Sequence, residues 1–153
     1  MSKLFILAFL LSLCPGVQAQ QQPSQDDVRQ SAMQGNAEAQ AKLGAMYLLG
    51  RNGVETDEQK AAEWMLKSAN QGFIEAEVIM AALYDRGMGV KNDVKIATAW
   101  YEKAAAQGHG PSLAILGKNA AAKGAVAFNY QAMRLSASKQ IPTEYANKIL
   151  LTK

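Results

Sequence analysis

A block of about 36 residues occurs twice in this chain, nearly in register, over residues 37–72 and 73–108. Aromatic residues recur at matching positions, and Trp64 of the first copy returns as Trp100, 36 residues later. Self-similarity at this period is typical of a solenoid, in which each unit buries its apolar face only against its neighbours. Because solenoids mostly form binding surfaces, the repeat constrains the architecture more tightly than the identity of a partner.

Each unit divides into two helical patterns separated by glycines. In the first unit, Ala39, Leu43 and Tyr47 follow one another at intervals of four residues and form one apolar stripe. The pattern restarts at Thr56, where a hydroxyl followed three residues later by Gln59 resembles a capping box. The second helix closes at a glycine suited to a left-handed C-cap. The sequence therefore predicts an all-α fold of α/α hairpins.

The flanks of the two clear copies carry weaker partial units. Ser24 opens a helix whose end resembles the ends of both repeats, so we expect an incomplete unit that caps the stack. A degenerate third copy covers residues 109–140, and Pro142 opens a short capping helix over residues 142–153. We expect one domain over residues 24–153, an α/α-hairpin solenoid of about three repeats with capping helices.

The repeated residues resemble the Sel1-like repeat, a relative of the tetratricopeptide repeat. In the first unit the match is carried by Leu43-Gly44-x-x-Tyr47, Gly53-Val54 and Gln71-Gly72, and the second unit matches at the corresponding positions. The resemblance implies a superhelical scaffold that is used mostly for protein–protein contact. It implies no shared catalytic residues and no cofactor.

The first nineteen residues have the pattern of a secretory signal peptide. Lys3 precedes an apolar run over residues 4–13, and a small-residue cleavage motif ends at Ala19. We expect cleavage after Ala19 and a periplasmic or secreted protein. A lipoprotein signal at Cys14 is the disfavoured alternative, because Leu13 stands where such signals have Gly, Ala or Ser.

Charge is unevenly distributed along the exported chain. We expect residues 20–23 to form a flexible tail. The segment 20–102 holds 8 Lys/Arg and 12 Asp/Glu, whereas residues 103–153 hold 7 Lys/Arg and 1 Asp/Glu. A solvated basic face explains this asymmetry, and contact with anionic lipid or polysaccharide is the alternative. Export and a mature charge of only +2 argue against nucleic acid as a partner.

The sequence offers no constellation of residues for catalysis or metal binding. His109 is the only histidine, and no cysteine remains after cleavage to join it as a ligand. The acidic loop over residues 55–58 lacks calcium-loop spacing and is better explained by helix capping. Gly87-Met88-Gly89 follows a helix and lacks the Lys-Ser/Thr of a phosphate loop, so it is typical of a turn. We expect a protein that is not an enzyme and that has no metal or cofactor.

The first helix of each unit has a second face, opposite the stripe that packs on its own hairpin. At 100° per residue, Lys42 and Leu48 fall on this face in the first unit. In solenoids the successive first helices line the concave surface, and the partner-binding residues predicted there are Lys42, Leu48, Ile79, Asp85, Ile115 and Lys118. Packing of Ile79 and Ile115 between neighbouring helices explains the same pattern equally well.

These observations predict an exported, non-enzymatic interaction module, monomeric when alone, that binds a protein partner in its concave groove. A sharper version is a periplasmic inhibitor or immunity protein that blocks an enzyme or toxin. The alternative is an envelope-assembly or structural adaptor whose basic C-terminal third contacts anionic lipid or polysaccharide. Membrane contact is expected only through that basic third.

Overall fold

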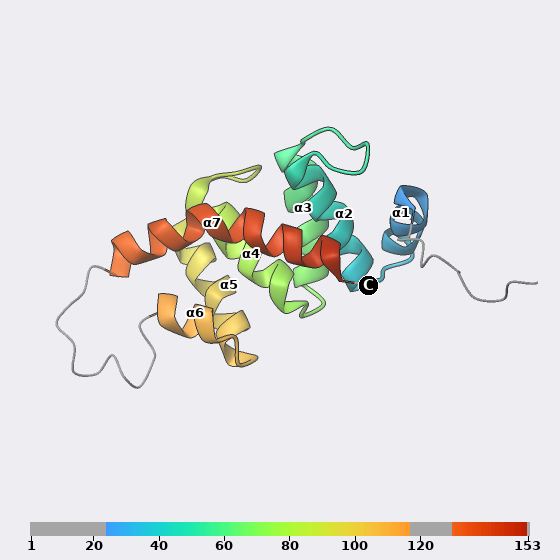
Figure 1. Ribbon diagram of the computed structural model, residues 1–153. Coiled ribbons are helices and arrows are strands. Elements are labelled where there is room, and N and C mark those ends of the chain that lie inside the picture. The colour runs from blue at the N-terminus through green and yellow to red at the C-terminus, as the bar shows by residue number, and fades with distance from the viewer. Residues whose placement is uncertain (1–23, 117–129, 153) are drawn as a thin grey trace, which may run out of the picture.

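A computed structural model describes residues 24–116 and 130–152, and within these ranges the chain forms seven helices and no strand (Figure 1). The all-α prediction is confirmed. In chain order the helices are α1 (Gln25–Met33), α2 (Ala37–Leu49), α3 (Glu58–Ala69), α4 (Ile74–Arg86), α5 (Val94–Ala106), α6 (Gly110–Ile115) and α7 (Tyr130–Leu151).

The two repeats are helix hairpins, in which α2 packs on α3 and α4 packs on α5. Glycine makes close packing possible within the first hairpin, because a Cβ on Gly44 would lie 3.0 Å from Met65 Cγ and 3.2 Å from the Ala61 carbonyl oxygen. Helices α2 and α4 both end at a left-handed glycine, Gly50 with φ 62° and Gly87 with φ 72°. The division of each unit by glycine is therefore confirmed.

Polar side chains cap the starts of α1, α2, α3, α5 and α6, whereas Phe73 at the start of α4 makes no side-chain cap hydrogen bond. Ser24 caps α1 in a reciprocal capping box with Asp27, as the sequence predicts for its start. The cap of α3 differs from the expectation at Thr56, because the helix begins at Glu58 and the Asp57 carboxylate accepts from Lys60 N at 2.9 Å. A shift of one residue places a charged acceptor at the helix terminus, where it also suits the helix dipole.

Helix α7 departs from the expectation of two separate pieces. The sequence predicts a break at Pro142, yet a single helix runs from Tyr130 to Leu151 through it. Proline removes one backbone hydrogen bond from a helix interior, but Ile141 and Pro142 are buried against the rest of the fold, so packing offsets the loss. Of the degenerate third copy expected over residues 109–140, residues 117–129 lie outside the described residues, and residues 130–140 form the first part of α7.

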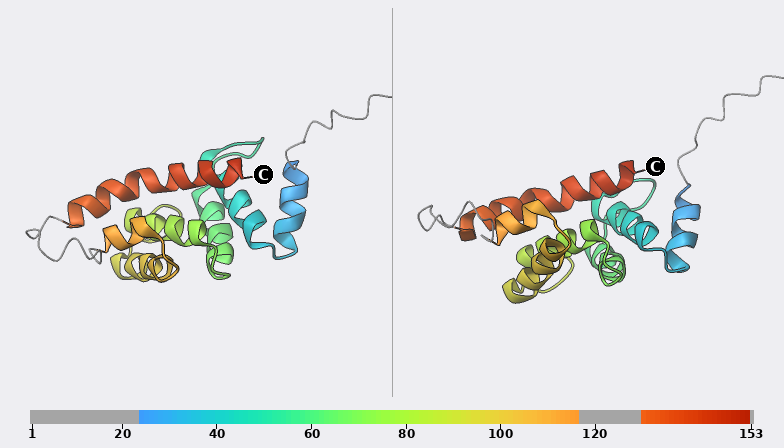
Figure 2. Two further views of the ribbon diagram at one scale, coloured as in Figure 1. Left: turned by 60° about the horizontal axis from the view of Figure 1, so that its bottom comes forward. Right: turned by 90° about the horizontal axis from the view of Figure 1, so that it is seen from below.

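Helix α7 lies along the row of first helices (Figure 2). It contacts α4 and α2 extensively and α6 less so, and its C-terminal end lies beside α2. Its residues Ile141, Ala146 and Ile149 belong to the same apolar cluster as the buried residues of α2 to α6. The C-terminal helix thus runs back across the repeats, against their order in the sequence, and holds them together.

Candidate functional site

Of the residues predicted to bind a partner, all but Lys118 belong to α2, α4 and α6, the helices that contact α7. By the A-helix face we mean the side of these three helices that packs against α7. Leu48, Ile79, Asp85 and Ile115 are all buried, with exposed fractions of 8%, 0%, 6% and 8%. Lys42 is half-buried and its Nζ pairs with Glu38 at 2.8 Å, whereas Lys118 lies outside the described residues. The expectation of an open groove is wrong for this conformation, and contact of these residues with a partner stays a prediction.

The physical reason is the apolar character of that face. A row of exposed aliphatic side chains along stacked helices is costly in water, at about 25 cal/mol for each Å² of apolar surface. Leu48 and Ile79 share an apolar cluster with Ile141 and Ile149 of α7, so the chain covers this face with its own helix. In this structure α7 occupies the A-helix face.

A histidine joins the start of α6 to α7. His109 is the N-cap of α6, and its Nδ1 lies 3.2 Å from Ser112 N and 2.7 Å from Ser112 Oγ. Its Nε2 lies 2.7 Å from Tyr145 Oη, with the two rings edge to face at 5.6 Å. Because Nδ1 must accept from the Ser112 N–H, the proton of the neutral ring is assigned to Nε2, which donates to the tyrosine oxygen.

Burial favours the neutral forms of this pair. Desolvation lowers the pKa of His109 below its ordinary value of 6.5, and the Lys148 cation lowers it further, while the Glu75 carboxylate opposes both. Desolvation also raises the pKa of Tyr145 above 10.0. Both side chains are therefore uncharged at neutral pH and meet as a neutral donor and acceptor.

An ion pair lies one turn further along α7. Lys148 Nζ is 3.0 Å from Glu75 Oε1 in the first turn of α4, and this hydrogen bond is the main reason that the pKa of Lys148 is raised. The lysine side chain is 61% exposed, so the pair contributes little to stability. It matters for position instead, because together with His109–Tyr145 it fixes which residues of α7 face which repeat. A third contact runs from the Arg86 guanidinium to the Lys139 carbonyl oxygen at 3.4 Å.

The His109–Ser112 contact does not form a catalytic dyad. Ser112 is fully buried, and the other ring nitrogen of His109 meets a phenol in place of the carboxylate that orients a catalytic histidine. Among the described residues no three His, Cys, Asp or Glu side chains come together as metal ligands. Gly89 sits against the backbone of residue 58, which accounts for the Gly-Met-Gly motif as a packed turn.

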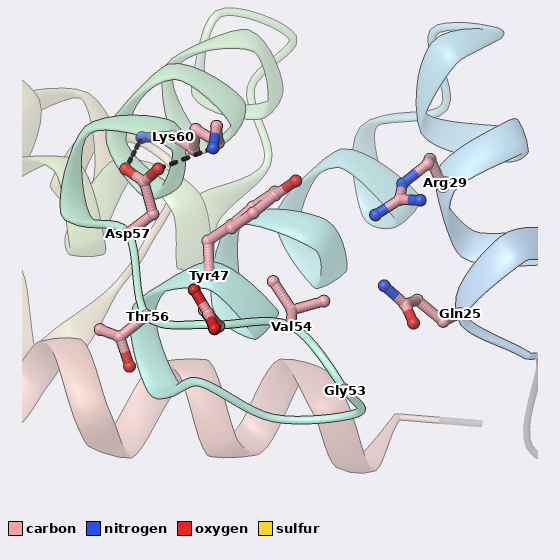
Figure 3. A pocket seen from close by; sticks show the side chains of 9 residues that line it. Gln25, Arg29, Tyr47, Gly53, Val54, Thr56, Asp57 and Lys60 are labelled. Atoms are coloured by element: carbon pink, nitrogen blue, oxygen red, sulfur yellow. Dashed lines mark hydrogen bonds and ion pairs between the residues drawn. The ribbon is translucent and has the colours of Figure 1, made fainter.

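A polar pocket of about 300 Å³ opens between α1 and the loop that leads into α3 (Figure 3). Arg29 enters it from α1, Tyr47 from α2, and Asp57 with Lys60 from the start of α3. The Asp57 carboxylate and Lys60 Nζ pair at 2.9 Å, so the pocket has no single sign of charge. Asp57 thus acts as the N-cap of α3.

The sequence did not predict the polar contacts that α7 makes with His109, Glu75 and Arg86. Differences between corresponding positions of the repeats could have indicated these contacts. Asn36, Phe73 and His109 hold the same N-cap position in successive units, and Glu75 corresponds to Glu38. The acidic residue of the first unit pairs within its own helix, whereas that of the second reaches α7.

Comparison with known proteins agrees with this architecture. The model of the Sel1 repeat family matches residues 37–73 and 74–109. A Sel1 repeat protein from Oxalobacter formigenes has a similar crystal structure, with 39% identity and a TM-score of 0.58, over 61% of this chain and 70% of that one. No curated protein gives a significant match.

A second solved structure is that of c5321, a protective antigen of uropathogenic Escherichia coli strains with an SLR fold. It is 32% identical with a TM-score of 0.56, and the match covers 82% of this chain but only 26% of c5321. No helix in the described ranges is long and apolar enough to cross a membrane. Proteins with Sel1 repeats generally mediate protein–protein interactions and are typically not catalysts. The repeat matches, the hairpin geometry and the solved relative together show that this chain belongs to the Sel1 repeat family.

Proposed function

We propose that the chain is an exported, non-enzymatic interaction module that binds a helix of a partner protein on its A-helix face, in exchange for α7. One observation carries the proposal: the face already holds a helix, α7, through the buried side chains Ile141, Ala146 and Ile149. Helix-in-groove binding is a common mode of protein recognition, in which one face of a helix supplies the apolar anchors.

The built-in helix sets how tightly a partner must bind. A tethered segment competes at an effective concentration on the order of mM. A partner helix therefore displaces α7 only if the rest of the partner protein makes additional contacts with this chain. A folded enzyme or toxin in the periplasm supplies such contacts, which favours an inhibitor or immunity role at one-to-one stoichiometry.

The adaptor alternative, with a basic C-terminal third on anionic lipid or polysaccharide, gains no support from the described residues. Lys148 is one of the cations of that third, and Glu75 already pairs with it at 3.0 Å. High salt provides the separating measurement, because exposed charge contacts are screened within about 8 to 10 Å at physiological salt. Partners held in the groove stay bound in high salt, whereas lipid or polysaccharide is released.

The test is to lock α7 in place and measure partner capture. A carbodiimide couples the Glu75 carboxylate to the Lys148 amine as an amide with loss of water, since the two groups are 3.0 Å apart. The matched control is the Lys148→Gln variant treated in the same way, which lacks this amine. Mass spectrometry of the peptides reports the extent of the lock.

We expect mature wild-type protein to capture a partner from periplasmic extract before coupling and to lose it afterwards. The treated Lys148→Gln control should keep it. Retention of every partner by the fully locked protein would show that the A-helix face is not the binding surface. Ile79→Asp and Ile115→Asp are unsuitable for this purpose, because both residues are buried and a carboxylate there would unfold the chain.

A further inference from the structure

We propose that the A-helix face selects its helix through His109 and Glu75, and that it favours a partner helix with a tyrosine and a lysine one turn apart. This inference rests on the proposed exchange of α7, and it names the chemistry of the incoming helix. In α7 the selected pair is Tyr145 and Lys148, framed by Ile141 and Ile149 at four residues before and after the tyrosine.

The two selecting groups come from different repeats and meet two positions of one helix. His109 Nε2 at the start of α6 is 2.7 Å from Tyr145 Oη, and Glu75 Oε1 at the start of α4 is 3.0 Å from Lys148 Nζ. Residues three apart lie on the same side of a helix. A helix that satisfies both contacts can lie on the face in only one register and one direction.

Capping alone does not account for His109. Asn36 holds the equivalent position in the first repeat and caps α2 well, with Oδ1 accepting from Ala39 N at 2.8 Å. The shorter asparagine has no second nitrogen on a ring that reaches out towards α7. The histidine therefore adds a donor, on the far side of its ring from the cap, that the helix start itself does not need.

The hydrogen bond by which His109 caps α6 determines which ring nitrogen is the donor. Nδ1 accepts from Ser112 N, so Nε2 carries the proton and presents it to α7. A phenylalanine in place of Tyr145 would leave that N–H without its acceptor in a partly buried site, whereas the tyrosine oxygen satisfies it. Glu75 similarly favours a cation at the second position and disfavours a carboxylate.

Acidification should weaken the hold on the helix. The charged or titratable groups around His109 are Glu75 of α4 and Tyr145 and Lys148 of α7. A proton on Nδ1 would point at the Ser112 N–H that now donates to it. Since burial lowers the pKa of His109, protonation favours the state with the ring exposed, and the contact loses strength as pH falls below about 6.5.

The test uses a fluorescent peptide of residues 130–152 as the incoming helix and the full mature chain as the receptor. The receptor carries Ile149→Ala in its own α7. This substitution weakens the packing of α7 on the A-helix face and leaves the residues of that face unchanged. A second receptor with Tyr145→Phe serves in case the first loses structure, and circular dichroism checks both. Fluorescence anisotropy gives the dissociation constant.

We expect the Tyr145→Phe peptide to bind about tenfold more weakly than the unchanged peptide, as the loss of one buried hydrogen bond implies. The Lys148→Glu peptide should also bind more weakly, and a Glu75→Lys receptor should restore its binding. A His109→Asn receptor should keep α6 capped and abolish the difference between the tyrosine and phenylalanine peptides. Lowering the pH from 7.5 to 5.5 should weaken binding to the receptor that keeps His109 and leave binding to the His109→Asn receptor unchanged.

The outcomes separate the two proposals. If the peptide binds but the phenylalanine and glutamate variants bind equally well, selection through His109 and Glu75 is overturned while exchange on the face stands. If the unchanged peptide binds neither receptor, the exchange itself fails and this inference fails with it. Restored binding of the Lys148→Glu peptide to the Glu75→Lys receptor supports both exchange and selection. A purely structural role for Glu75 would not be restored by reversing the charges of the ion pair.

Discussion

At the scale of single residues, the two repeats form the same side-chain hydrogen bond between the first helix and the end of the second, with different acceptor groups. Gln71 Nε2 donates to Gln40 Oε1 at 2.7 Å in the first repeat, and Gln107 Nε2 donates to Glu77 Oε2 at 2.8 Å in the second. Glu77 is 3% exposed, and desolvation raises its pKa above the ordinary value of 4.5 despite the hydrogen bond from Gln107. The second repeat thus buries a carboxyl group where the first buries an amide.

We predict that Glu77→Gln stabilises the protein at pH 7 by on the order of 1 kcal/mol, because it removes a buried charge and keeps the acceptor for Gln107. A raised pKa means that the folded state holds the proton more tightly than the unfolded state. The wild type is therefore at no disadvantage below pH 4.5 and loses stability as pH rises through the raised pKa. Urea unfolding at pH 4 and pH 7 should show a difference only at pH 7. An equal difference at both values would contradict this account.

Glycines at the turns are not equivalent. Gly89 has φ 66°, and a Cβ built there would lie 1.9 Å from the Glu58 carbonyl oxygen, whereas Gly72 has φ 83° with nothing within 4 Å. We expect Gly72→Ala to cost about 1 to 2 kcal/mol, the penalty of a left-handed backbone alone. Gly89→Ala should cost clearly more, because the backbone of α3 must also move. Thermal unfolding of the two variants side by side gives the comparison.

Local residue patterns were predictable from the sequence because their causes lie within a few residues. Gly72 at a helix end and Ser24 at a helix start adopt the geometry that their types favour. The cap of α3 was misplaced by one residue, since Thr56 and Asp57 are both good caps and only packing decides between them. The His109–Tyr145 contact spans 36 residues in the sequence, and no local rule predicts it.

At the scale of elements, α7 shows where local reasoning about helices fails. Pro142 is a strong signal for a helix boundary, and the sequence on either side indicates two short helices. In the fold α7 is held along α2 and α4, so tertiary contacts extend it through the proline. The hairpins of the repeats were predictable because each recurs in register, whereas α7 occurs once and offers no copy for comparison.

The docking of α7 depends on a few buried side chains. Ile149 is 1% exposed within the main apolar cluster, while Leu151, two residues later, is 74% exposed. We predict that Ile149→Ala lowers the free energy of unfolding by about 2 to 4 kcal/mol. Leu151→Ala should change it by less than about 0.5 kcal/mol. Chemical denaturation measures both.

Hydrogen exchange locates the effect of Ile149→Ala. If α7 is a separately docked element, its amides should lose protection in this variant while those of α4 and α5 largely keep theirs. Uniform loss of protection across all helices would instead show that α7 and the repeats unfold as one unit, which would weaken the case for exchange.

At the scale of the whole molecule, the chain covers its own solenoid with the helices that flank the repeats. Helix α1 covers the first hairpin through the small cluster around Val28 and Leu43, and α7 covers the A-helix face. Repeat arrays need caps because each unit exposes an apolar face where stacking stops. Here the cap at the C-terminal end turns back along the array, so the same helix ends the stack and covers the A-helix face.

This arrangement predicts the behaviour of a chain that ends at residue 129. Removing α7 takes Ile141, Ala146 and Ile149 out of the main apolar cluster and exposes the apolar side chains of the A-helix face that they cover. Exposed apolar patches promote association. We expect the truncated protein to bind a hydrophobic dye and to self-associate with increasing concentration in sedimentation velocity. The mature chain shortened only by residues 151–153, whose Leu151 is exposed, is the matched control and should remain monomeric.

Addition of the peptide of residues 130–152 should return the truncated protein to a one-to-one complex without dye binding, because the peptide restores the missing cover. If the truncated chain stays monomeric and excludes the dye, the A-helix face must close by rearrangement of the repeats themselves. In that case the repeats do not require α7 to cover the A-helix face, and the face loses its main reason to bind a helix.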